Sequence, residues 1–145
     1  MVSPWPFAIW GIDLIGPLPV GRSGLKFAVM AVDYFTKWAE AEPLATITSN
    51  KMINFVTKNI ICRYGVPQKI ITDNGTQFES EEFQNFCERF KIQKSFSAVA
   101  HPQANGQVEA VNKILKSTIK KQLEKAKGGW VDKLPRERHQ LQGVS

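Results

Sequence analysis

Residues 69–75 have the sequence KIITDNG, a short β-branched strand followed at once by an acidic residue and a turn signal. On the N-terminal side, Thr48, Ser49 and Asn50 are N-cap candidates for a helix that extends to about Tyr64. Its apolar residues follow a helical period that ends before a Gly and a Pro. On the C-terminal side, Ser80 is an N-cap candidate for a helix over 81–90. A strand between two helices is typical of an α/β protein.

The remaining elements follow from the same patterns. Apolar or β-branched runs predict strands over 8–14, 26–34 and 92–97, and 37–42 reads as the hairpin partner of the second strand. A long helix is predicted over 107–127. Strands first, then alternating strands and helices, predict an α/β fold: a mixed sheet with helices packed on its faces.

Length and composition indicate one ordinary globular domain. The chain has 145 residues, of which 43% are hydrophobic and 22% charged, so a disordered or disulfide-stapled class is excluded. Charges interrupt every apolar run before it reaches the roughly 20 residues of a membrane span. The N-terminus lacks the pattern of a secretory signal. We therefore expect an intracellular protein with no membrane partner.

The positive charge is concentrated in one quarter of the chain. Residues 1–109 contain ten basic and ten acidic side chains, whereas residues 110–145 contain nine basic and three acidic ones, which accounts for the net charge of +6. Such clustering favours a polyanionic partner, most plausibly nucleic acid. The alternative is a solvated Lys-rich helix face.

Three carboxylates occupy unusual positions. Asp13 interrupts an apolar strand, where Asp is disfavoured; Asp73 directly follows the strand over 69–72; and Glu109 opens the long basic helix. Each has a structural alternative. Asp13 could face solvent, residues 73–75 could form a β-turn, and Glu109 could be a first-turn acid favoured by the helix dipole.

Taken together, these carboxylates could converge on divalent cations, because Mg²⁺ takes oxygen ligands. Without cations they would repel one another and some would protonate. Two ions about 3.5–4 Å apart can activate an attacking oxygen and stabilise a leaving one in phosphoryl transfer. Asn112, Lys113, Lys116 and Lys120 follow Glu109 at helical spacing, on the face that a phosphodiester backbone would need. A simple Glu109–Lys113 pair is the alternative.

Five motifs carry a family resemblance: WGIDLIGPLP at 10–19, VDYFTKW at 32–38, RYGVP at 63–67, TDNGTQF at 72–78 and HPQANGQVE at 101–109. Over about residues 4–135 the chain resembles the catalytic cores of integrases from retroviruses and, more closely, from gypsy-type LTR retrotransposons of plants. The signature of that family is two Asp and one Glu, with 35 residues between the second Asp and the Glu. Here that interval is residues 74–108.

The resemblance implies an RNase H-like fold, a five-stranded mixed sheet flanked by helices, over residues 1–135. It implies that Asp13, Asp73 and Glu109 are the catalytic residues and ligate two Mg²⁺ or Mn²⁺ ions per site. The reaction would be attack of water or a DNA 3′-hydroxyl on a phosphodiester, which first trims the element's ends and then joins them to target DNA. Residues 136–145 depart from the family and are predicted to form a divergent, disordered tail.

The resemblance also implies partners and a location. DNA is the expected partner, both as the element's ends and as target DNA, with Asn112, Lys113 and Lys116 near the end DNA and Asn105 beside the site. A homodimer or higher oligomer is expected, acting in the nucleus after a cytoplasmic stage. Lys120 is a further predicted DNA-binding residue. Two alternatives remain: an inactive retroelement remnant that binds nucleic acid through Lys113–Lys127 or binds nothing, and an RNase H-like nuclease acting on RNA–DNA hybrids.

Overall fold

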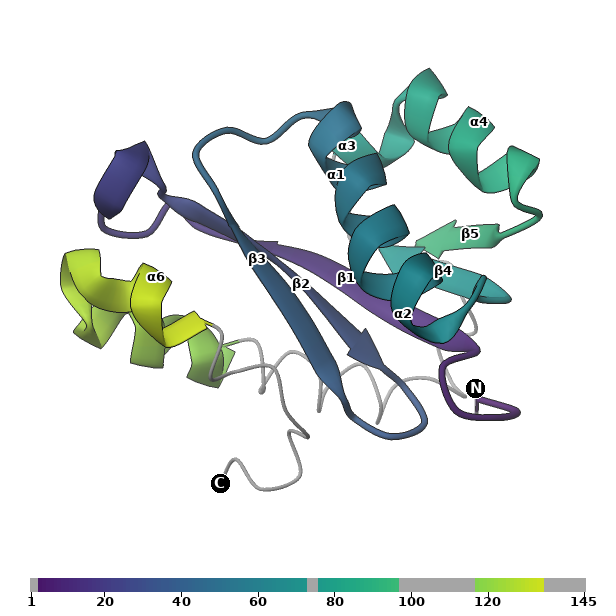
Figure 1. The fold of residues 1–145 in the computed structure, drawn as a ribbon, viewed down its shortest axis with the longest axis horizontal. Coiled ribbons are helices and arrows are strands. Elements are labelled where there is room, and N and C mark those ends of the chain that lie inside the picture. The colour runs from purple at the N-terminus through teal and green to yellow at the C-terminus, as the bar shows by residue number, and fades with distance from the viewer. Residues whose placement is uncertain (1–2, 73–75, 97–116, 135–145) are drawn as a thin grey trace.

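The computed structural model describes residues 3–72, 76–96 and 117–134 (Figure 1). Within them, five strands form one sheet in the order β3-β2-β1-β4-β5. Their bounds are β1 Ile9–Ile15, β2 Phe27–Asp33, β3 Ala39–Leu44, β4 Lys69–Thr72 and β5 Gln93–Phe96. Strand β1 pairs antiparallel with β2 and parallel with β4, and β4 pairs parallel with β5. The sheet is therefore mixed, which confirms the predicted fold class.

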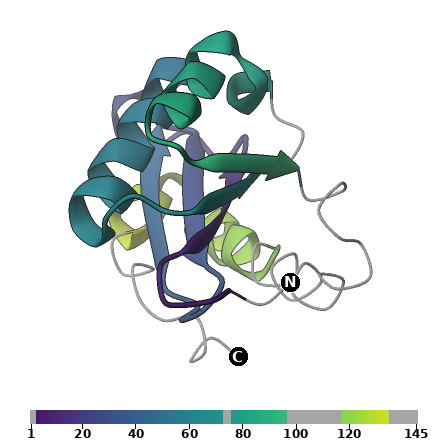
Figure 2. The same cartoon turned by 90° about the vertical axis from the view of Figure 1, so that its right-hand side faces the viewer.

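One face of the sheet is covered by helices from the middle of the chain (Figures 1 and 2). The first is continuous from α1 (Ser49–Phe55) through the π-helical stretch η2 (Val56–Ile61) to α2 (Cys62–Tyr64). It is followed by two shorter helices, α3 (Thr76–Glu79) and α4 (Glu81–Arg89).

The predicted caps of these helices are confirmed. The side chain of Thr48 accepts a hydrogen bond from the Lys51 N–H, and that of Ser80 accepts one from the Phe83 N–H, both at 3.2 Å. Each cap satisfies a backbone donor that has no partner within its helix.

The other face is covered by the C-terminal helices (Figure 2). Residues 117–125 are helical, which confirms that part of the predicted helix, and the rest of the 107–127 range lies largely outside the described residues. The helices η3 (Lys127–Gly129) and α6 (Trp130–Lys133) follow. The Trp130 indole donates a 2.6 Å hydrogen bond to the Pro19 carbonyl, and so ties this end of the chain to the loop after β1, near η1 (Arg22–Gly24).

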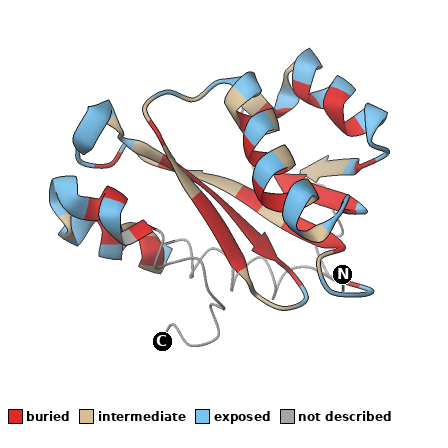
Figure 3. Cartoon of the chain, in the orientation of Figure 1, coloured by how far each residue is buried: buried red, intermediate tan, exposed pale blue. Residues whose placement is uncertain are grey.

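Buried residues lie on the strands and on the helices that cover the sheet (Figure 3), and they form a core on each of its faces. The larger core joins alternate β1 residues, Trp10 and Ile12, to the apolar faces of α1 and α4. The second core joins Ile15 to Ile119 and Leu123 of the C-terminal helix. Because strand side chains alternate between faces, Asp13 lies on the side of the second core.

The third strand begins two residues later than the sequence predicted, at Ala39 rather than residue 37. The cause is a tight turn organised by the fully buried Asp33, whose carboxylate accepts hydrogen bonds from the Thr36 N–H at 2.9 Å and the Thr36 hydroxyl at 2.7 Å. The same carboxylate accepts the Phe7 N–H at 3.0 Å. Lys37 then adopts a positive φ of 64°, which ends the turn.

A second buried carboxylate connects β3 to α2. Glu40 is fully buried and accepts hydrogen bonds from the Trp38 indole at 2.8 Å and the Tyr64 hydroxyl at 2.7 Å. Arg63 lies 3.2 Å from its other oxygen. Burial, and then the hydrogen bond to Glu40, raise the pKa of Tyr64 to about 12. This network joins segments 24 residues apart in sequence.

The two cysteines are expected to differ sharply in reactivity. Cys87 is buried, and burial raises its pKa to about 11, whereas Cys62 is exposed. At pH 8 only about a thousandth of Cys87 would be thiolate, the form that reacts with alkylating reagents. We expect iodoacetamide to label Cys62 within minutes and Cys87 only after unfolding, as read by peptide mass spectrometry. Equal labelling of both in the folded protein would contradict this core packing.

Candidate active site

Asp13 lies on the central strand of the sheet. It is half-buried and pairs across the sheet with Met30 of β2. Strand β1 continues through it to Ile15, so Asp13 is held by regular strand pairing rather than by a loop. It lies on the face of the sheet that carries the second core, where Ile15 packs with Ile119 and Leu123.

The second aspartate of the predicted set, Asp73, directly follows β4 in the sequence. Strands β1 and β4 run parallel, and their last pair is Ile12 with Thr72. In the sequence, Ile12 is followed by Asp13 and Thr72 by Asp73. Asp73 and Glu109 themselves lie outside the described residues.

The described residues contain one of the three expected metal ligands. Within residues 3–72, 76–96 and 117–134, no three His, Cys, Asp or Glu side chains gather in a way that could hold a metal ion. Asp13 fits such a site in its chemistry, since a half-buried carboxylate supplies the hard oxygen donor that Mg²⁺ and Mn²⁺ prefer.

The basic helix is described in part. Ile119 and Leu123 are buried against the sheet, while Lys121 and Lys125 are exposed. Lys120 is partly exposed and lies 4.0 Å from Glu124, one turn along the same helix. The other predicted DNA-binding residues lie outside the described residues: Asn105, Asn112, Lys113 and Lys116.

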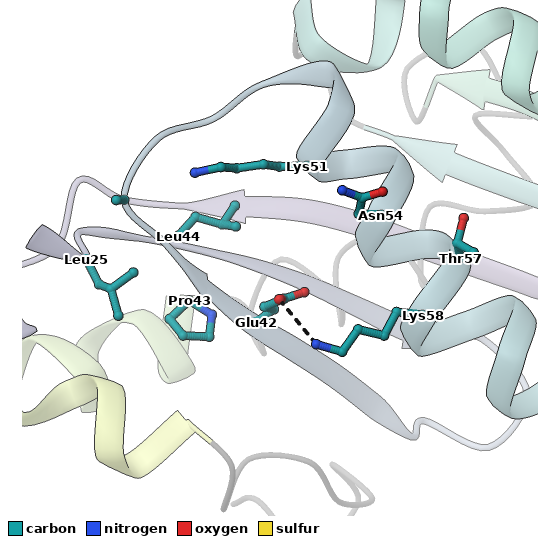
Figure 4. A pocket seen from close by; sticks show the side chains of 9 residues that line it. Leu25, Glu42, Pro43, Leu44, Lys51, Asn54, Thr57 and Lys58 are labelled. Atoms are coloured by element: carbon teal, nitrogen blue, oxygen red, sulfur yellow. Dashed lines mark ion pairs between the residues drawn. The ribbon is translucent and has the colours of Figure 1, made fainter. Parts of the chain in front are cut away.

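The described surface also has an open groove between β3 and the helix that begins with α1 (Figure 4). Its volume is about 620 Å³, and it is lined mainly by β3 and α1, including Leu44, Lys51 and Asn54. Lys58 and Glu42 form an ion pair of 3.7 Å on its wall. Leu44 belongs to the core on the opposite face of the sheet from Asp13, so the groove is not part of the carboxylate site.

A comparison with protein families identifies the fold. The family model described as Integrase core domain matches residues 4–102, which include β1, β4 and both aspartates. The chain belongs to the integrase core domain family.

Retroviral relatives of this integrase core support the assignment. The Gag-Pol polyprotein of avian reticuloendotheliosis virus is 35% identical over 126 residues, or 87% of this chain. That of gibbon ape leukemia virus is 32% identical over 131 residues, or 90% of this chain. The chain spans 11% and 8% of the lengths of these two polyproteins.

A solved structure shares the fold. A chain of the simian T-cell lymphotropic virus intasome matches with a TM-score of 0.64 and 28% identity. The match covers 86% of this integrase core and 44% of the viral chain. Among the described residues, no helix is both long and apolar enough to cross a membrane.

Sequence reasoning did not single out the tertiary contacts of β1 and of the β2–β3 hairpin. Gly11 and Tyr34 meet on the face of the sheet that carries Asp13, and Asp33 and Glu40 form hydrogen bonds that hold the hairpin. A signal for the first pair was present, because an isolated Gly inside a strand pattern often marks a close approach of another group. No comparable local signal marks the partners of Glu40.

Proposed function

We propose that this chain is the catalytic core of a retroelement integrase, a metal-dependent polynucleotidyl transferase that trims DNA 3′ ends and joins them to target DNA. The observation that carries the proposal is the register of β1 and β4. In the last residue pair between β1 and β4, Ile12 and Thr72 are each followed in the sequence by an aspartate, in a chain of the integrase core family. Carboxylates that lie close together suit divalent cations.

In this proposal Asp13, Asp73 and Glu109 hold two Mg²⁺ or Mn²⁺ ions. When bound, such ions activate an attacking oxygen and neutralise charge on the leaving one. The protein's own contribution is to fix Asp13 on a rigid central strand and to cover its face of the sheet, since preorganised ligands need no rearrangement during the reaction. The reaction requires no covalent enzyme intermediate.

DNA is the proposed substrate. Support comes from the excess of nine basic over three acidic residues in 110–145 and from the exposed lysines of the helix over 117–125. Lys120, with Asn105, Asn112, Lys113 and Lys116, would contact phosphates. The matched intasome chain supports a homodimer or higher oligomer as the working form. The proposed place of action is the nucleus, after a cytoplasmic stage.

A labelled duplex carrying a recessed 3′ end tests the function. We expect joined or nicked products with Mn²⁺ or Mg²⁺, none with EDTA, and none from Asp73→Asn, because the variant loses a proposed ligand. Binding of the same duplex by Asp73→Asn should persist and weaken steeply as salt rises, since phosphate contacts release counterions. The wild type serves as the matched reference for both readouts.

Three results would contradict this proposal. DNA binding without metal-dependent products from the wild type would favour the inactive remnant. Products only from RNA–DNA hybrids would favour the nuclease. Unchanged products from Asp73→Asn would show that the carboxylates have been misassigned.

A further inference from the structure

On the face of the sheet that carries Asp13, one residue of β1 has no side chain. The alternate residues of β1 on that face are Ile9, Gly11, Asp13 and Ile15, of which Gly11 has no side chain. Gly11 pairs with Val32 of β2 on one side and Ile71 of β4 on the other. A glycine inside a central strand weakens that strand, so its presence calls for a reason.

The gap is filled by a tyrosine ring. Tyr34 directly follows β2, and its N–H donates a 3.0 Å hydrogen bond to the Ile9 carbonyl. Its ring then reaches across β1. A Cβ on Gly11 would lie 2.7 Å from the Tyr34 Cε1 atom and 3.2 Å from its hydroxyl oxygen. No side chain fits at position 11 while the ring stays in place.

The ring is firmly seated. Tyr34 is 8% exposed and packs in one cluster with Ala8, Ile9 and Ile71. The Lys37 ammonium lies 5.7 Å from the ring centroid and donates a 3.0 Å hydrogen bond to the Tyr34 carbonyl. The ring thus lies on β1 with contacts to β4, between the strands that lead to the two aspartates.

We propose that Tyr34 is a positioning residue for the metal site of the proposed function. The next side chain beyond Gly11 on this face of β1 is Asp13. In this proposal the ring lies beside that carboxylate, limits the directions in which it can turn and keeps water from that side. Position 11 is a glycine because the Tyr34 ring occupies the space that a side chain would fill. The inference rests on the proposed function, and concerns the ring rather than the hydroxyl.

Mn²⁺ binding without DNA is the test, measured from the electron paramagnetic resonance signal of free Mn²⁺. Groups that orient a metal ligand typically change metal affinity about 10–100-fold. We expect Tyr34→Phe, which keeps the ring, to bind Mn²⁺ as the wild type does. Tyr34→Leu and Gly11→Ala should each weaken Mn²⁺ binding about 10-fold, because Tyr34→Leu removes the ring and Gly11→Ala displaces it.

A double variant adds a sharper check. Gly11→Ala combined with Tyr34→Leu should bind no more weakly than Tyr34→Leu alone, because the new methyl group no longer meets a ring. Phe83→Leu is the control for a purely structural effect. This ring is fully buried on the opposite face of the sheet, so its truncation should lower the melting temperature and leave Mn²⁺ affinity unchanged.

The outcomes separate the two proposals. If the wild type binds Mn²⁺ and Tyr34→Leu and Gly11→Ala bind it equally well, the positioning role is wrong and the proposed function stands. If affinity falls in step with melting temperature in all variants, including Phe83→Leu, the role is structural and the inference is again wrong. If the wild type itself binds no Mn²⁺, both proposals fail.

Discussion

Replacing Asp13 by Asn is expected to reduce metal-dependent strand transfer at least about 100-fold, more than the loss of a group that only orients a ligand. The change keeps the shape of the side chain and removes the charge that would bind the cation. Asp13 lies on the central strand, next to the residue that pairs with Thr72, so no other described carboxylate on β1 can take its place. A strand-transfer time course gives the ratio directly.

The fold of Asp13→Asn should remain intact. In the absence of metal its melting temperature should not fall, because removing one of several clustered carboxylates relieves their repulsion. Added Mn²⁺ should raise the melting temperature of the wild type, since a ligand that binds only the folded state stabilises it. The variant should show little of that rise.

Asp33→Asn is the matched control for Asp13→Asn. It makes the same chemical change on the neighbouring strand, at a carboxylate that holds the β2–β3 turn. We expect a lower melting temperature and, below it, a metal response like that of the wild type. A normal rate of strand transfer from Asp13→Asn, or an equal loss of metal response in both variants, would refute the assignment of Asp13.

Glu40→Ala is expected to have the largest effect on stability. Removing one partner of a buried charged network typically costs about 3–5 kcal/mol. The Tyr64 hydroxyl and the Trp38 indole would lose their acceptor, and Arg63 its partner. For a domain of this size that corresponds to a fall in melting temperature of about 10 °C or more. Denaturant titration and calorimetry measure both quantities.

Two variants on the same strand sharpen this test. Glu42→Ala removes a more exposed carboxylate whose ion pair with Lys58 spans 3.7 Å, and should cost about 1 kcal/mol or less. Glu40→Gln keeps an acceptor for Trp38 and Tyr64 and should fall between the two. If Glu40→Ala and Glu42→Ala destabilise the protein equally, the buried network does not hold β3 to α2.

Local patterns were enough to locate most elements and the candidate carboxylates. The strand over 69–72, the caps at Thr48 and Ser80, and the helix over 81–90 differ from the structure by at most one residue, because each depends on neighbours within a few positions. The anomaly of Asp13 in an apolar run was visible for the same reason. The family motifs added the expected role of Asp73 and Glu109, which periodicity alone left open.

The tertiary structure decided what the sequence could not. The order β3-β2-β1-β4-β5 makes β1 the centre of the sheet and sets Ile12 beside Thr72, 60 residues away in the chain. It also places the Tyr34 ring against Gly11 and brings the Glu40 carboxylate within hydrogen-bond distance of the Tyr64 hydroxyl. These contacts join residues that are distant in sequence. The free energy of such packing depends on both partners together and cannot be assigned to either residue alone. Residue types and periods therefore determined which groups could act, whereas strand order and packing determined which of them meet.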